Sequence, residues 1–71
     1  METLDQVKTN ETVKINQITD PELFEVVSSF GFVEGSQVTV ISKLPGALTC
    51  EFKRSRFAIR AEDAASIVVE Q

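Results

Sequence analysis

A pair of glycines in the middle of the chain most constrains its fold. Gly31 and Gly35 stand four residues apart, where a helical apolar pattern ends and an alternating strand pattern begins. Glycine is favoured at helix C-termini and in tight turns because it has no Cβ to clash in left-handed conformations. The pair predicts a helix, a tight turn and a strand in immediate succession. This order favours a small barrel-like binding module and leaves little room for an enzyme pocket.

The helix before these glycines is predicted over residues 22–30. Asp20 is suited to accept a backbone N–H bond as the N-cap, and Pro21 fits the first helical position. The apolar residues recur at helical spacing and are expected to form one core-facing stripe: Leu23, Val26, Val27 and Phe30. Phe24 falls at the edge of this stripe, so we expect it to be only partly covered.

Alternating apolar and polar residues predict five short strands. They fall at residues 12–18, 38–41, 48–53, 57–59 and 67–69, with a short helical turn over 61–65. Ile18 is out of phase with the residues before it, which predicts a bulge or strand end near Gln17. Turns are expected over 44–47 and at Arg54-Ser55. The sequence therefore predicts a mainly β fold with one short α-helix, closed or nearly closed into a small barrel.

Length and charge narrow the function classes. The 71 residues fit one domain spanning 1–71, and the net charge of −4 argues against binding to a nucleic-acid backbone. The N-terminus lacks the order of a signal peptide, and no apolar run reaches the roughly 18–20 residues of a membrane span. We therefore expect a cytoplasmic protein without a membrane span. Four of the seven basic residues lie close together: Lys53, Arg54, Arg56 and Arg60.

Side chains that carry catalysis or bind metals are scarce. The chain has no His, and its one cysteine, Cys50, is expected to point inward as a small hydrophobic residue. Glu62 and Asp63 are adjacent on a helical turn, so their carboxylates diverge and make a poor metal site. The sequence predicts neither an enzyme nor a cofactor or metal site.

Three segments together resemble the FeoA family, the small cytoplasmic accessory proteins of bacterial ferrous iron transport. Leu4 to Val7, followed by Thr12-Val13-Lys14-Ile15, resembles the opening of the family. Glu22-Leu23 through Phe30-Gly31 to Val38 resembles its helix ending in Leu-Gly and its Gly-x-x-Val signature. Phe57-Ala58-Ile59-Arg60 and Ala64 to Val69 resemble its closing pattern.

The resemblance implies an SH3-like barrel and an adaptor that contacts the GTPase portion of the membrane transporter FeoB. The chain departs from the family pattern at Phe24 and Val26, where family helices usually carry basic residues, and at Ala47, where a second proline is usual. A glycine common in the later hairpin turn is replaced by Arg54 or Ser55.

The alternative is an SH3-like regulatory module related to the C-terminal domain of metal-dependent repressors. Self-association through an open barrel edge is compatible with either function.

The candidate contact residues have two interpretations. Phe24, Phe32 and Leu44, the last beside Pro45, either cap the ends of the barrel or form a small exposed apolar patch. Arg54 and Arg56 belong either to a solvated hairpin tip or to a docking surface for an acidic partner face or the inner membrane leaflet.

Overall fold

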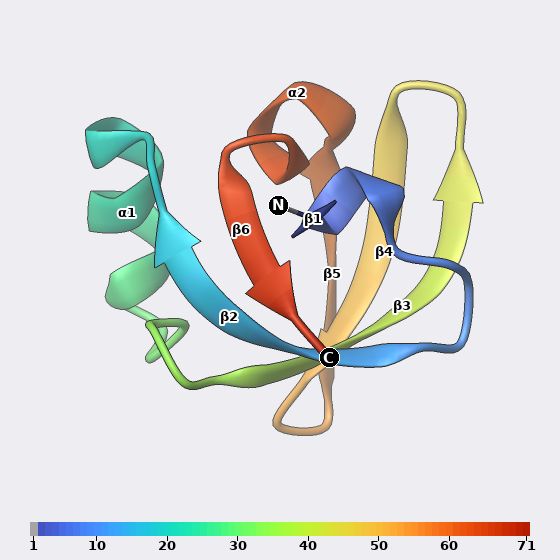
Figure 1. Cartoon of the computed structure of the whole chain (residues 1–71), viewed down its shortest axis with the longest axis horizontal. Coiled ribbons are helices and arrows are strands. Elements are labelled where there is room, and N and C mark those ends of the chain that lie inside the picture. The colour runs from blue at the N-terminus through green and yellow to red at the C-terminus, as the bar shows by residue number, and fades with distance from the viewer. Residues whose placement is uncertain (1) are drawn as a thin grey trace.

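The computed structural model of the protein describes residues 2–71, and these residues form a strongly curved antiparallel sheet with two helices (Figure 1). The elements follow the chain as β1 (Glu2–Thr3), a 3₁₀ helix (Leu4–Gln6), β2 (Thr12–Ile18), α1 (Pro21–Ser28), β3 (Gln37–Leu44), β4 (Ala47–Phe52), β5 (Ser55–Arg60), α2 (Ala61–Ala64) and β6 (Ile67–Glu70). The mainly β prediction is confirmed. The sheet has six strands where the sequence predicted five, because Glu2 and Thr3 pair with Val69 and Val68.

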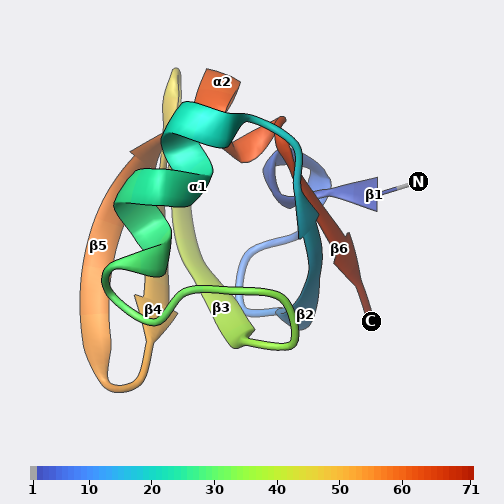
Figure 2. The ribbon, with the colours of Figure 1, turned by 90° about the vertical axis from the view of Figure 1, so that its left-hand side faces the viewer.

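The strands are ordered β1-β6-β2-β3-β4-β5, and every pair is antiparallel. The sheet curls so that β5 and the β6–β1 end lie on opposite sides, as Figure 2 shows. Helix α1 lies across the opening between β5 and β2. The barrel is thus closed partly by a helix, and β5 is an edge strand at that opening.

A phenylalanine cluster fills the core beneath α1. Phe32 is 2% exposed and packs edge-to-face against Phe52 and Phe57, with ring centroids 5.2 and 5.6 Å apart. The predicted inward alternation of β4 is confirmed, because Leu48, Cys50 and Phe52 are all buried. Most of the remaining core comes from β2, β3, β6 and the N-terminal segment: Leu4, Val7, Val13, Ile15, Ile18, Val38, Val40, Ile67 and Val69.

The residues predicted to cap the two ends of α1, Asp20 and Gly31, have the predicted roles. The Asp20 carboxylate accepts a bond from the Glu22 backbone N–H at 3.0 Å. At the other end Gly31 has φ +85°, its N–H donates to the Ser28 carbonyl, and the Phe32 N–H donates to the Val27 carbonyl at 3.2 Å. These two bonds form a Schellman motif.

The predicted core-facing stripe of this helix is half wrong. Val27 is buried and Leu23 packs against the core, but Val26 is 58% and Phe30 is 71% exposed. The α-helical residues end at Ser28 rather than at residue 30, so Phe30 belongs to the Schellman turn and leaves the helical face. Val26 is turned by about 100° from Val27 and projects beside the core rather than into it.

The pairing registers of the strands locate a bulge and two turns. The pairing of β2 with β6 shifts between Ile15 and Gln17, which turns Ile18 inward and confirms the predicted bulge. The β3–β4 turn lies at Pro45-Gly46, as predicted. The β4–β5 turn is Lys53-Arg54 and not Arg54-Ser55, because Ser55 already pairs with Phe52.

Candidate protein-interaction surface

A groove lies between α1 and the β4–β5 hairpin, and we call it the α1–β5 groove. Its volume is about 640 Å³. The floor is apolar and comes from the core, where Phe32, Phe52 and Ile59 are buried. The remaining lining residues are Leu23, Val26, Val27, Phe30, Lys53, Ser55, Phe57, Ala58, Arg60 and Asp63.

The walls of the groove carry apolar side chains that solvent reaches. Val26 and Phe30 form the α1 wall and are more than half exposed. Phe57 is half-buried on the opposite wall, where it also contacts the Phe32 ring. Large exposed apolar residues gathered along a concave surface are typical of binding sites rather than of ordinary protein surface.

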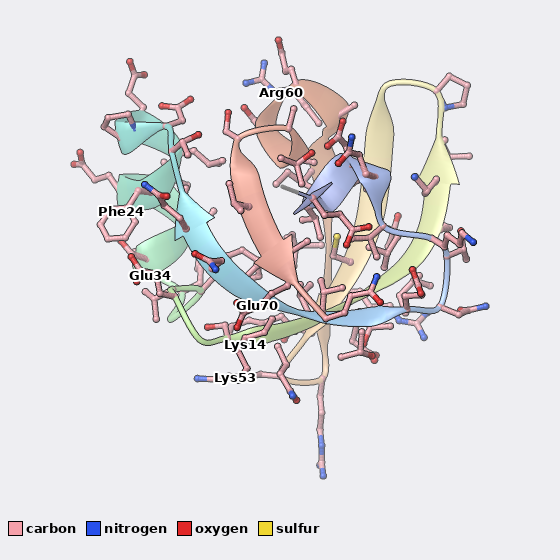
Figure 3. All side chains as sticks on the ribbon, in the orientation of Figure 1. Lys14, Phe24, Glu34, Lys53, Arg60 and Glu70 are labelled. Carbon is pink, nitrogen blue, oxygen red and sulfur yellow. The ribbon has the colours of Figure 1, made fainter. Side chains whose placement is uncertain are left out.

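Charged side chains mark the two ends of the groove. Lys53 and Arg60 lie at opposite ends of the molecule in Figure 3. Lys53 Nζ lies 5.2 Å from the centroid of the Phe52 ring, a cation–π distance. Arg60 forms ion pairs with Glu62 at 2.9 Å and Asp63 at 3.0 Å. The hydrogen bond to Asp63, together with the two negative charges, raises the pKa of Arg60 further above its usual range.

The structure does not gather the predicted contact residues into one patch. Phe24 is 44% exposed on α1 and points away from the barrel in Figure 3, and it does not line the groove. Leu44 and Pro45 are exposed at the β3–β4 turn, and Arg54 lies at the β4–β5 turn. Figure 1 places these two turns at opposite ends of the sheet. Arg56 is exposed and pairs with Glu51 at 3.5 Å.

Phe32 is the one predicted contact residue that the structure removes from the surface. At 2% exposed, it lies beneath α1 and offers a partner almost no area. The sequence left Phe32 with two interpretations, a cap on the end of the barrel or part of a small exposed apolar patch. The Schellman bond from its N–H to Val27 turns the chain back under the helix and explains the difference.

Of the residues that line the groove, only Phe32 was in the predicted contact set, and the large apolar side chains that this set lacked on the walls are Val26, Phe30 and Phe57. A signal for Phe30 was present in the sequence. The residue directly before a C-terminal helix glycine occupies the last turn, where the helical face is lost. Phe57 could not be distinguished by pattern, since it alternates inward like a core residue yet stands on an edge strand.

Cys50 is buried, and burial raises the pKa of its thiol from 9.0 to about 11. Among residues 2–71, no group of three or more His, Cys, Asp or Glu side chains is placed to hold a metal ion. No helix in the same range is long and apolar enough to cross a membrane.

Solved structures share the fold of this chain at low sequence identity. The FeoA protein of Chlorobium tepidum matches with a TM-score of 0.89 and 17% identity, over 97% of this chain and 69% of that one. The zinc-complexed FeoA of Stenotrophomonas maltophilia, described as an SH3 domain protein, matches at 0.86 and 23% identity over 99% and 91%. The SH3-like barrel predicted from the sequence is thereby confirmed.

A manganese-dependent transcriptional repressor has the same fold in part of its chain. Its TM-score is 0.84 at 19% identity, and the match covers 99% of this chain but 41% of the repressor. A comparison with curated protein sequences gives no match. The profile of the FeoA domain matches residues 2–71, which is nearly the whole sequence. This chain therefore belongs to the FeoA domain family.

Proposed function

We propose that this protein is a cytoplasmic accessory protein of ferrous iron transport that contacts the GTPase domain of an FeoB-type membrane transporter. The FeoA domain match over residues 2–71 carries the proposal. The protein acts by biasing the conformational states of its partner and performs no chemistry of its own. It needs neither a metal nor another cofactor for this role.

The distribution of surface side chains supports a role in contact. Phe24, Leu44 and the walls of the α1–β5 groove expose large apolar area on a domain of only 71 residues. Arg54 and Arg56 add a positively charged hairpin end to a chain of net charge −4. An uneven charge layout of this kind orients a charged protein partner as it approaches.

A calorimetric titration of the protein into the isolated GTPase domain tests the proposal. It is run once with GDP and once with a non-hydrolysable GTP analogue. We expect binding in both series, with an affinity that differs between the nucleotides, because an adaptor that biases conformational states must bind them unequally. Equal affinity in the two states, or no heat with both proteins folded, would contradict it.

Two variants locate the contact. Arg54→Glu combined with Arg56→Glu should weaken binding and lower its salt dependence while the protein stays folded, with a small fall in the melting temperature because Arg56→Glu places a carboxylate opposite Glu51. Phe24→Ala should weaken binding while the fold persists, since Phe24 is 44% exposed. A variant that melts early while retaining its affinity would assign its residue to the fold instead.

The alternative is an SH3-like regulatory module that acts on a metal-dependent regulator. It is supported by the shared fold with manganese-dependent repressors, for which a manganese-bound structure reaches a TM-score of 0.87. Co-purification separates the two functions. Recovery of a transporter fragment supports the adaptor, and recovery of a winged-helix regulator supports the module.

A further inference from the structure

The unpaired edge of β5 runs along the α1–β5 groove. In the sheet formed by residues 2–71, β5 pairs with β4 alone, from Phe52↔Ser55 to Ala47↔Arg60. Residues 57–60 all line the groove, although their side chains alternate between the two faces of the sheet. Four consecutive lining residues place the groove along β5, and Figure 2 shows α1 across the opening beside that strand, so a peptide in the groove would lie next to β5.

The hairpin register identifies the backbone groups at this edge. Phe52 and Ser55 flank a two-residue turn, so they form a hydrogen-bonded pair, and such pairs alternate along the ladder. At the other end of the ladder the Ala61 N–H donates to the Gly46 carbonyl at 2.9 Å, so Gly46 and Ala61 are also a hydrogen-bonded pair, as the alternation from Phe52 and Ser55 predicts. It follows that Ser55, Phe57 and Ile59 bond to β4.

The intervening residues direct their backbone groups away from β4. Arg56 and Ala58 each present an N–H and a carbonyl at the free edge of β5, and Arg60 presents its N–H. The Arg60 carbonyl precedes α2 and serves the first turn of that helix. These groups are what an additional antiparallel strand requires.

Side chains along β5 set the sequence that such a strand needs. The outer face carries Arg56, Ala58 and Arg60, all exposed. Both arginines form surface ion pairs, Arg56 with Glu51 and Arg60 with Glu62 and Asp63, which an added strand would share or replace. The inner face carries Phe57 and Ile59, opposite the exposed apolar wall of α1. An added strand should therefore place acidic residues opposite the two arginines and apolar residues at the two positions between them that face α1. The order is acidic, apolar, any residue, apolar, acidic.

A second copy of this chain does not meet that requirement. Antiparallel pairing of two β5 edges about Ala58 would place Arg56 of one copy opposite Arg60 of the other, and like charges in cross-strand pairs destabilise a sheet. The 71 residues also contain no segment with the acidic, apolar, any, apolar, acidic order. The charges of the edge thus select a segment of a different protein.

We propose that the β5 edge binds an extended segment of another protein, with this five-residue order, as a further antiparallel strand of the sheet. Its backbone pairs with Arg56, Ala58 and Arg60, and its apolar side chains enter the α1–β5 groove beside Val26 and Phe30. The groove volume of about 640 Å³ lies within the range of binding pockets, about 300–1,000 Å³. This mode of recognition holds whichever protein supplies the segment, and it goes beyond the adaptor function proposed above.

A blocked peptide with the sequence GSEVTVEGS tests it by titration into the isotopically labelled protein, followed by NMR. We expect shifts of the Arg56, Ala58 and Arg60 amide resonances and cross-strand contacts from the peptide to Ala58. A control peptide with lysines in place of both glutamates should bind about tenfold more weakly, because it places like charges opposite the arginines. No binding of the first peptide to the folded protein overturns the proposal. So do shifts confined to α1, or equal binding of the two peptides.

Ala58 offers a matched pair of variants. Ala58→Pro removes the outward N–H without removing a bond to β4, and proline is tolerated at such edge positions. We expect it to weaken peptide binding about tenfold, whereas Ala58→Thr, which keeps the N–H, leaves the affinity within about twofold. The amide spectrum of each free variant confirms its fold.

Ala58→Pro binding as tightly as Ala58→Thr would overturn strand addition. Arg56→Glu provides an independent reading should the proline variant fail to fold. It should weaken GSEVTVEGS and strengthen the lysine peptide, and the opposite pattern contradicts the proposal. None of these titrations contains a GTPase domain, so their result is separate from that of the transporter experiment.

Discussion

Two residues of the β4–β5 turn adopt a backbone conformation that side chains with a Cβ disfavour. Lys53 has φ +51° and Arg54 has φ +68°, as in the turns that usually contain Asn-Gly. A left-handed residue other than glycine costs about 1–2 kcal/mol. Arg54 thus combines an exposed positive charge with a local loss of stability.

Replacing Arg54 by glycine should therefore stabilise the protein. Part of the relief is offset by the greater freedom of glycine in the unfolded chain, so we expect a gain of about 1 kcal/mol in the free energy of unfolding. For a domain of this size the melting temperature should rise by about 4–8 °C. Thermal unfolding followed by circular dichroism measures the change, with Arg54→Ala as the control that keeps the Cβ. If the glycine variant melts no higher than the alanine variant, the positive φ of Arg54 does not destabilise the protein.

Cys50 makes stability depend on pH in the alkaline range. Burial raises the pKa of its thiol from 9.0 to about 11, so the unfolded chain loses this proton first as pH rises. The raised pKa adds about 3 kcal/mol to the free energy of unfolding while the unfolded chain also keeps the thiol protonated. This stabilisation is fully present below pH 9 and is lost between pH 9 and 11. Urea denaturation across that range should show a steeper fall for the wild type than for Cys50→Ala. Parallel curves would mean that the thiolate is accommodated in the fold.

At the scale of the element, the C-terminus of α1 depends on a single glycine. Gly31 has φ +85°, and the nearest atom that a Cβ there would meet is Nζ at the end of the Lys53 side chain, 3.4 Å away. Gly31→Ala should therefore destabilise through the backbone and not through crowding, by about 1–2 kcal/mol.

Chemical denaturation compares Gly31→Ala with Glu25→Ala, an exposed substitution within the helix. Glu25→Ala should change the unfolding free energy by less than about 0.5 kcal/mol. Equal effects of the two substitutions would show that the Schellman turn tolerates a side chain.

The same helix shows how far sequence reasoning reaches. Asp20, Pro21 and Gly31 are local signals, and each was interpreted correctly because capping depends on residues within one turn. The exposure of Val26 and Phe30 was missed, because it depends on where α1 sits over the opening between β5 and β2. That position is set by tertiary packing, and the periodicity of apolar residues along a short helix does not report it.

For the molecule as a whole, the phenylalanine cluster decides whether the chain folds. A domain of this size has a net stability of about 3–5 kcal/mol, and truncation of a buried Phe to Ala costs about the same. Phe32→Ala should therefore leave much of the protein unfolded at 25 °C, because Phe32 contacts both Phe52 and Phe57.

Circular dichroism and the dispersion of the amide spectrum report the unfolded fraction. Phe32→Leu keeps most of the buried volume and should remain folded with a lower melting temperature. Full retention of the native spectrum by Phe32→Ala would indicate a more stable domain than its core suggests.

The sequence also predicted the mainly β barrel and most strand positions, since alternation in β2, β3 and β4 repeats at every second residue. It missed β1, because two residues carry no period, and their pairing with β6 joins the two ends of the chain. The α1–β5 groove was also missed, because it forms between segments that are distant in sequence. Its walls come from segments about thirty residues apart in sequence, and the spacing of residues contains no sign that they meet.

The pairing of β1 with β6 has a practical consequence for protein engineering. The ends of the described range lie side by side, because β1 pairs with β6 and the Gln71 side chain donates to the Glu2 carboxylate at 3.3 Å. In Figure 2 these two strands lie on the side opposite β5. A short linker could join them, and the β3–β4 turn at Pro45-Gly46 is exposed enough to supply new ends. The protein is thus suited to circular permutation and to insertion as a cassette into a surface loop of a carrier. An affinity tag or a sensor chip attached at either end would leave the groove facing solvent.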